Sequence, residues 1–134
     1  MSLKSKREKF VEGRTPLLGD EFALRVGAQA DRQAFVLAAR RALGRVCHVS
    51  ESHIYPEDDP ERLAELVWDW DDLEVILELE QLLHVSVGDP GDGFPRFLFG
   101  RFFWRKWPGP KSVGEWTMQV AEHLYAKAQA ETTS

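Results

Sequence analysis

The chain has 134 residues, of which 43% are hydrophobic and 29% are charged. This composition excludes a disordered tail, a collagen-like repeat and a disulfide scaffold, and the length suffices to bury one core without metal or disulfide crosslinks. The lone cysteine, Cys47, fits a reducing compartment, and no apolar run approaches the roughly 18 residues of a membrane span. Residues 1–9 show no secretion signal. We therefore expect a cytoplasmic, single-domain protein without a membrane span.

The net charge of −5 at pH 7 is unevenly distributed along the chain. Residues 1–48 carry ten basic and five acidic side chains, whereas residues 51–92 carry fourteen acidic side chains and one basic one. Residues 93–134 carry six basic and three acidic side chains. Because contacts with phosphates need a continuous positive surface, this pattern argues against nucleic-acid binding. It favours a basic partner protein or internal pairing between the blocks.

The N-terminal third is predicted to contain a short and a long helix. Residues 1–13 offer few apolar side chains to bury, so we expect a flexible lead-in before a single helical domain over residues 14–130, with residues 131–134 as a flexible C-terminus. A short helix is predicted around residues 20–26. A longer one is predicted over residues 31–46, where apolar side chains recur at spacings of four, four and three. These side chains are Phe35, Ala39, Leu43 and Val46.

The middle of the chain is predicted to hold a short helix and then the most regular one. Asp59 and Pro60 are typical of a helix start, because the carboxylate caps free amides and proline needs no donor at the first position. This helix is expected over residues 60–66. Acidic side chains then crowd the first turn of the next helix, where the helix dipole favours negative charge. Its apolar row is Trp70, Leu73, Ile76, Leu79 and Leu83, and its acidic start is Asp69, Asp71 and Asp72.

The last third combines an aromatic and basic segment with a final helix. Residues 88–93 (GDPGDG) interrupt the preceding helix, and residues 94–111 (FPRFLFGRFFWRKWPGPK) follow. Ser112 and Glu115 form a capping-box pattern, in which each side chain can accept a hydrogen bond from the other residue's backbone amide. No alternation of valine and isoleucine indicates a sheet, so we predict an all-α protein. The apolar stripe of the final helix is Val113, Trp116, Val120 and Leu124.

Several short motifs, taken in their order, resemble the acyl carrier protein family. Residues 68–80 (WDWDDLEVILELE) are similar to the acidic second helix of that family, and residues 84–87 (HVSV) to the tail that follows it. Residues 112–116 (SVGEW) resemble the opening of its last helix, and residues 42–54 the end of its first helix and the next loop. The likeness covers roughly residues 33–125. It implies a four-helix acyl-carrier-like bundle with an N-terminal extension and an aromatic-basic insert before the last helix.

The chain departs from this family where the prosthetic group would be attached. By the resemblance, Asp69 stands at the position of the serine that carries phosphopantetheine, and Trp68 and Trp70 replace the neighbours of that serine. A carboxylate is not an acceptor for this modification, and residues 53–85 contain no serine or threonine. The resemblance therefore implies a carrier-like protein that has lost its cofactor. The simplest interpretation of Asp69 is an N-cap of the acidic helix.

The acidic helix also carries the predicted partner surface. Enzymes recognise carrier proteins with basic patches, chiefly through this helix, so the resemblance implies a basic protein partner in acyl-chain metabolism. A solvated face is the alternative. The predicted function is a non-catalytic interaction or regulatory module, and the alternative is a genuine carrier that is modified or loaded in a non-standard way. The surface comprises Asp69, Asp71, Glu74 and Glu78, of which the last three share a helix face.

The aromatic-basic insert over residues 94–111 is a second candidate interface. Aromatic side chains mixed with arginine are typical of an oligomer or partner interface, and such a mixture also suits stacking on single-stranded nucleic acid or a position at a membrane surface. The alternative is that the aromatics pack over the bundle in place of the family's short third helix, and burial of each phenylalanine would contribute roughly 1.5 to 3 kcal/mol. The interface residues would be Phe97, Arg101, Trp104, Arg105 and Trp107.

No motif in the sequence supports catalysis or metal binding. The acidic residues Asp69, Asp71, Asp72 and Glu74 lack the spaced loop and glycine of a calcium-binding hand, and adjacent helix residues point about 100° apart. Cys47 is expected to be a small buried side chain at the end of its helix. We predict no enzyme activity, no metal and no cofactor, and the oligomeric state stays open.

Overall fold

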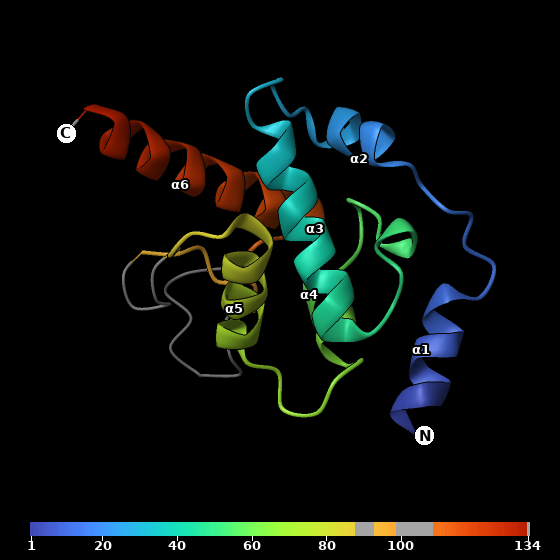
Figure 1. Cartoon of the computed structure of the whole chain (residues 1–134). Helices are drawn as coiled ribbons and strands as arrows, with labels where there is room; N and C mark the ends of the chain where they lie inside the picture. The colour runs from blue at the N-terminus through green and yellow to red at the C-terminus, as the bar shows by residue number, and fades with distance from the viewer. Residues whose placement is uncertain (88–92, 99–108, 134) are drawn as a thin grey trace.

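The computed structural model of the chain describes residues 1–87, 93–98 and 109–133. Over these residues the secondary structure is entirely helical, with six α-helices, one short 3-10 helix and no strand, which confirms the predicted all-α class (Figure 1). None of the described helices is both long and apolar enough to cross a bilayer. The elements are α1 (Leu3–Val11), α2 (Gly19–Val26), α3 (Gln33–Cys47), η1 (Glu51–His53), α4 (Pro60–Ala64), α5 (Asp72–Leu83) and α6 (Val113–Thr133).

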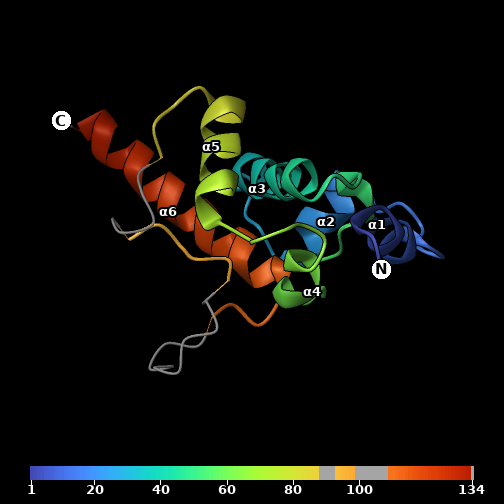
Figure 2. The ribbon, with the colours of Figure 1, turned by 90° about the horizontal axis from the view of Figure 1, so that it is seen from below.

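Helix α3 is the centre of the fold, because it packs against both α5 and α6. The apolar rows that predict these helices supply the core, with Leu43, Leu79 and Trp116 each at most 1% exposed. Helix α2 covers α3 and the start of α6. In both views, α1 and α5 lie on opposite sides of α3, and α1 is far from the C-terminal end of α6 (Figures 1 and 2). The acidic helix α5 is therefore at one flank of the molecule.

Local capping signals mark the starts of α4 and α6, as the sequence predicts. The carboxylate of Asp59 accepts a hydrogen bond from the amide of Glu61, with Pro60 at the first helical position. The Ser112 hydroxyl accepts a hydrogen bond from the amide of Glu115 at 3.1 Å. A side chain at Gly114 would place its Cβ 3.0 Å from the Cβ of Pro56, so the start of α6 can lie directly on the loop before α4.

The two chain ends differ from our expectation of flexible segments. Residues 3–11 form α1, whose first turn is capped by the Ser2 hydroxyl. Phe10 is only 3% exposed, and the Arg7 side chain donates a hydrogen bond to the Leu66 carbonyl at 3.1 Å. At the other end, α6 continues to Thr133. The composition of residues 1–13 does not predict α1, because this helix is attached by one aromatic side chain and polar contacts rather than by an apolar stripe.

Candidate interaction surface on α5

The acidic helix begins later than the resemblance implies. The side chain of Asp71 accepts a hydrogen bond from the amide of Leu73 at 2.9 Å, so Asp71 is the N-cap of α5. Asp69 lies before the helix in the left-handed region, with φ of 47°. The prediction that Asp69 caps this helix is therefore wrong. Asp71 has the extended backbone (φ −134°) that an N-cap requires, whereas Asp69 does not.

Asp72 and Trp70 attach the start of α5 to the described part of the aromatic segment. The Asp72 carboxylate accepts hydrogen bonds from the Trp70 indole at 2.6 Å and from the Phe97 amide at 2.9 Å. Burial raises the pKa of Asp72 above its ordinary value, and the hydrogen bond from Trp70 opposes this shift. Phe97 lies between Trp70 and Trp116, with ring centroids 4.9 and 5.1 Å away. Residues 93–98 thus form a support beneath the start of α5.

The aromatic segment is only partly described. Phe94 and Phe97 lie in the core, and residues 99–108 lie outside the described residues. Phe94 is 5% exposed and lies edge-on to the ring of His123, and Phe97 is 1% exposed. For these two side chains, the interpretation that the aromatics pack over the bundle is confirmed. Phe97 is therefore unavailable as an interface residue, because its ring is enclosed by two tryptophans. The other four predicted interface residues, Arg101, Trp104, Arg105 and Trp107, lie outside the described residues.

The outer face of α5 and the residues before it combine exposed apolar and acidic side chains. Trp68 is 79% exposed, Leu77 49% and Leu73 40%. The apolar periodicity places Leu73 in the core, but the structure turns it outward. We define the α5 surface as Trp68, Asp69, Asp71, Leu73, Glu74 and Leu77, all of which are exposed.

Within the described part of the chain, no ion pair involves Asp69, Asp71 or Glu74. Glu78 differs from these three residues, because it faces α3. One of its oxygens lies 3.6 Å from the Arg45 guanidinium, and its side chain is 29% exposed. Three of the four predicted partner residues therefore belong to the α5 surface, and Glu78 lies at its edge. Apolar periodicity did not predict the exposed apolar members, because an apolar row that faces outward has the same spacing as one that faces the core.

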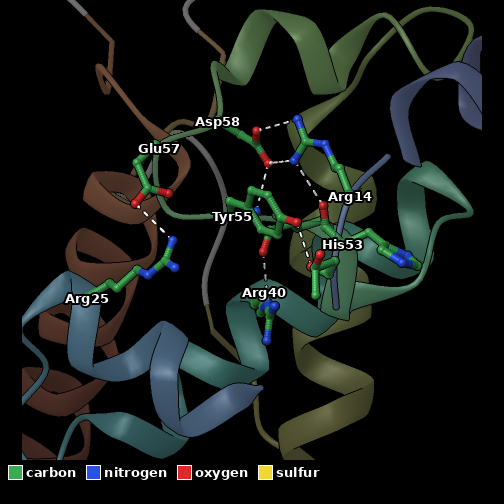
Figure 3. Close-up of polar contacts among 9 residues, drawn as sticks. Arg14, Arg25, Arg40, His53, Tyr55, Glu57 and Asp58 are labelled. Carbon is green, nitrogen blue, oxygen red and sulfur yellow. Dashed lines mark hydrogen bonds and ion pairs between the residues drawn. The ribbon is translucent and has the colours of Figure 1, made fainter. Parts of the chain in front are cut away.

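A second group of charged side chains lies beside α3, around the loop between η1 and α4 (Figure 3). The Arg14 guanidinium donates two hydrogen bonds of 2.8 Å to the carboxylate of Asp58, which also accepts from the Tyr55 amide at 2.7 Å. Arg40, which is 2% exposed, donates to the carbonyl oxygens of Ile54 and Leu17 at 3.2 and 2.8 Å. These groups bind one another, so we assign the cluster a structural role in attaching residues 14–17 to the domain.

Neither the thiol nor a cluster of metal-ligating side chains is a candidate site among the described residues. Cys47 is fully buried as predicted, and burial raises the pKa of its thiol to about 12, so it stays protonated at neutral pH. No three side chains among the described His, Cys, Asp and Glu residues are grouped to hold a metal ion. Comparisons of the chain with protein-family models, with curated proteins and with solved structures find no match. The α5 surface is the feature from which function can be argued.

Proposed function

We propose that this chain is a non-catalytic acyl-carrier-like protein that has lost phosphopantetheine attachment and presents the α5 surface to a basic protein partner. The observation that carries this proposal is the α5 surface itself. It exposes Trp68, Leu73 and Leu77 beside acidic side chains that form no ion pair with the described residues. Exposed apolar side chains surrounded by charge are typical of interaction sites.

The composition of this surface defines the partner that would fit it. An exposed tryptophan supplies the kind of anchor that dominates binding energy at interfaces, and Leu73 and Leu77 add exposed apolar area on the first turns of α5. Carboxylates around them attract a positively charged surface and raise the rate of encounter. The complementary surface is therefore an apolar depression bordered by lysine or arginine. Simple solvation explains the acidic residues but not the exposure of Trp68, which favours a binding role over the solvated-face alternative.

The acyl-carrier part of the proposal is supported by the arrangement of three helices. In the resemblance, the residues of α3, α5 and α6 correspond to the family's first, second and last helices. In the structure, α3 packs against the other two. Asp69 is exposed just before α5, where an attachment residue would have to be accessible. A carboxylate there keeps the negative charge near the helix N-terminus but cannot form the phosphodiester.

The alternative function is a carrier loaded in a non-standard way, for example with an acyl chain held in its core. Phe97 counts against it, because its ring fills the space between Trp70 and Trp116 under the start of α5. An acyl chain at that place would have to displace a fully buried phenylalanine. Such displacement would sacrifice roughly 1.5 to 3 kcal/mol of apolar burial before the chain made any contact.

The proposal is tested by restoring the missing hydroxyl. We would incubate the wild type and an Asp69→Ser variant with coenzyme A and a permissive phosphopantetheinyl transferase, and measure the intact mass. We expect the variant to gain one phosphopantetheine and the wild type to gain none. Asp71→Ser is the matched control, because serine also caps a helix and the variant should remain unmodified.

Two further results decide between the alternatives. Modification of the wild type would favour the genuine carrier, and a folded Asp69→Ser variant that stays unmodified would overturn the acyl-carrier part of the proposal. Adding Glu74→Lys or Leu77→Asp to Asp69→Ser should slow modification by about tenfold, because the transferase would dock on the altered surface. An unchanged rate would remove the α5 surface from the proposal.

A further inference from the structure

Helix α1 has fewer attachments to the domain than α2, α5 or α6. It lies at the edge of the molecule (Figure 1), and no other described helix packs extensively along it. Phe10 is its one buried side chain, and Val11 is partly buried beside it. Among the described residues, a single hydrogen bond joins α1 to residues beyond position 14, from the Arg7 side chain to the Leu66 carbonyl. The helix is therefore held at few points.

The chain directly after α1 is held much more firmly. Arg14 donates two hydrogen bonds to the Asp58 carboxylate, and the Leu17 amide donates to the Ser52 carbonyl at 2.8 Å. Gly13 lies between the two regions, with φ of 73° and no atom within 4 Å of the place of a Cβ. Because glycine has no side chain, its backbone can rotate there with little steric restriction. Gly13 is therefore placed as a hinge between a weakly held helix and a firmly held segment.

Helix α1 lies beside the place where the end of α3 meets α4. The Cys47 thiol at the end of α3 is fully buried and donates to the Leu63 carbonyl of α4 at 3.6 Å. Burial raises the pKa of this thiol to about 12, and the positive charge of Arg7 opposes the shift. Arg7 also donates to the Leu66 carbonyl just after α4. One side chain of α1 is thus close to both sides of the junction that encloses Cys47.

A groove of about 390 Å³ lies between α1 and α4, with mainly opposite charges on its two sides. The α1 side supplies two lysines, whereas the α4 side supplies three carboxylates and one arginine. Within the described residues no ion pair joins the two sides, so their attraction acts across solvent and is screened by salt. These charged residues are Lys6, Lys9, Asp59, Glu61, Arg62 and Glu65.

We propose that α1 is a hinged cover that moves away by rotation at Gly13 while the rest of the domain stays folded, and that its opening uncovers Cys47. The closed state depends on the burial of Phe10, the hydrogen bond from Arg7 and the attraction across the groove. The contacts of Arg14 hold the chain after the hinge, so opening leaves the packing of α3 against α5 and α6 intact. The Cys47 thiol reports this motion.

Opening has a consequence for the α5 surface. Leu66, which α1 binds when closed, precedes Trp68 by two residues. Opening removes two lysines from beside the carboxylates of α4, so the uncompensated negative charge close to Trp68 in sequence increases. A basic partner would bind this open form better and shift the population toward it. This consequence rests on the proposed function, whereas the opening itself is measured without any partner.

Labelling of Cys47 by N-ethylmaleimide, followed by intact mass at one fixed pH, tests the proposal on the full chain. We expect native wild type to be labelled at a rate that hardly changes at low urea concentration, because local opening exposes little surface. The reagent is uncharged, so an increase of the rate with added salt would report the screened attraction. Combining Lys6→Glu with Lys9→Glu should raise the rate about tenfold, since both reversed charges then face carboxylates.

Lys4→Glu is the matched control, because it makes the same change on α1 outside the groove and should leave the rate within about twofold. Phe10→Ala removes the buried attachment and should raise the rate about a hundredfold or more. Circular dichroism verifies that each variant is folded. Labelling that follows the urea dependence of global unfolding at every concentration would overturn the proposal. So would a folded variant with Lys6→Glu and Lys9→Glu that is labelled no faster than Lys4→Glu.

Discussion

The Arg14–Asp58 cluster and the α5 surface use similar residues for opposite purposes. In the cluster, Asp58 is 9% exposed and accepts three hydrogen bonds, two of them from one guanidinium. On the α5 surface, Asp69, Asp71 and Glu74 are exposed and form no ion pair with the described residues. A buried charge needs all of its partners inside the protein, whereas an exposed one is hydrated and can bind elsewhere.

This contrast shows why charge density along the chain does not by itself distinguish an exposed, unpaired acidic surface from a buried, paired one. Both regions lie in the acidic block of residues 51–92, and in sequence both are short runs of carboxylates. The fold surrounds one run with arginine and backbone amides and leaves the other beside exposed tryptophan and leucine. In the second run, Asp69 and Glu74 could contribute to binding a partner without first losing an ion pair to the described residues.

Removal of Asp58 should have the largest effect on stability. Asp58→Ala leaves the Arg14 guanidinium without its carboxylate in a largely buried place, so we expect a loss of about 3 kcal/mol in the free energy of unfolding. Urea denaturation followed by circular dichroism measures this loss. Asp59→Ala is the control and should lose about 1 kcal/mol, because only a helix cap is removed. Equal losses in the two variants would show that the buried Arg14–Asp58 pair contributes no more to stability than a helix cap.

Asp72 connects the core to the α5 surface, and its removal should have the next largest effect on stability. Asp72→Ala leaves the Phe97 amide and the Trp70 indole without their acceptor, which should cost about 2 kcal/mol of stability. A weakened support should also change the fluorescence of Trp70 and Trp116. A loss below about 0.5 kcal/mol would contradict the role of Asp72 as the connection.

The raised pKa of Asp72 gives this connection a pH dependence. Above the ordinary value of 3.8, the folded state still holds a proton that the unfolded chain has released. This contribution to stability is therefore complete below pH 3.8 and is lost as the pH rises through the folded-state pKa. Urea unfolding of the wild type and of Asp72→Asn should show a stability difference that favours the wild type more at low pH. A stability difference between the two proteins that does not change with pH would contradict the raised pKa of Asp72.

The two aspartates before α5 should differ in their effects on stability. Asp71→Ala removes the hydrogen bond to the Leu73 amide and should cost about 1 kcal/mol. Asp69→Gly removes no cap and keeps a residue that tolerates the left-handed φ of 47°, so its effect should stay within about 0.5 kcal/mol. Thermal unfolding of both variants measures the difference, and the reverse order would restore Asp69 as the cap.

The smallest effect is expected on the α5 surface itself. Leu77→Ser replaces a half-exposed side chain, so the free energy of unfolding should change by no more than about 0.5 kcal/mol. The same substitution in the Asp69→Ser background should slow modification by the transferase. A variant that loses stability but keeps its modification rate would show that Leu77 belongs to the core rather than to an interface.

Local patterns were sufficient to predict most of the helices. The apolar row of α3 and the capping residues Asp59 and Ser112 act within a few residues, so their effects can be read along the chain. Helix α5 was predicted from its apolar spacing, and its N-terminal acidic residues were recognised. The burial of Cys47 followed from its position at the end of an apolar row.

The features that local patterns did not predict depend on contacts between residues far apart in the sequence. Helix α1 depends on Phe10 and on a hydrogen bond to Leu66, and the start of α5 depends on Phe97, 25 residues beyond its hydrogen-bond acceptor Asp72. Periodicity identifies apolar rows but not which row meets a neighbouring helix, so the exposure of Leu73 could not be predicted. The charges follow the same rule. The number of charged side chains is known from the sequence. Burial and the positions of their partners decide whether each charge stabilises the fold or stays exposed and unpaired.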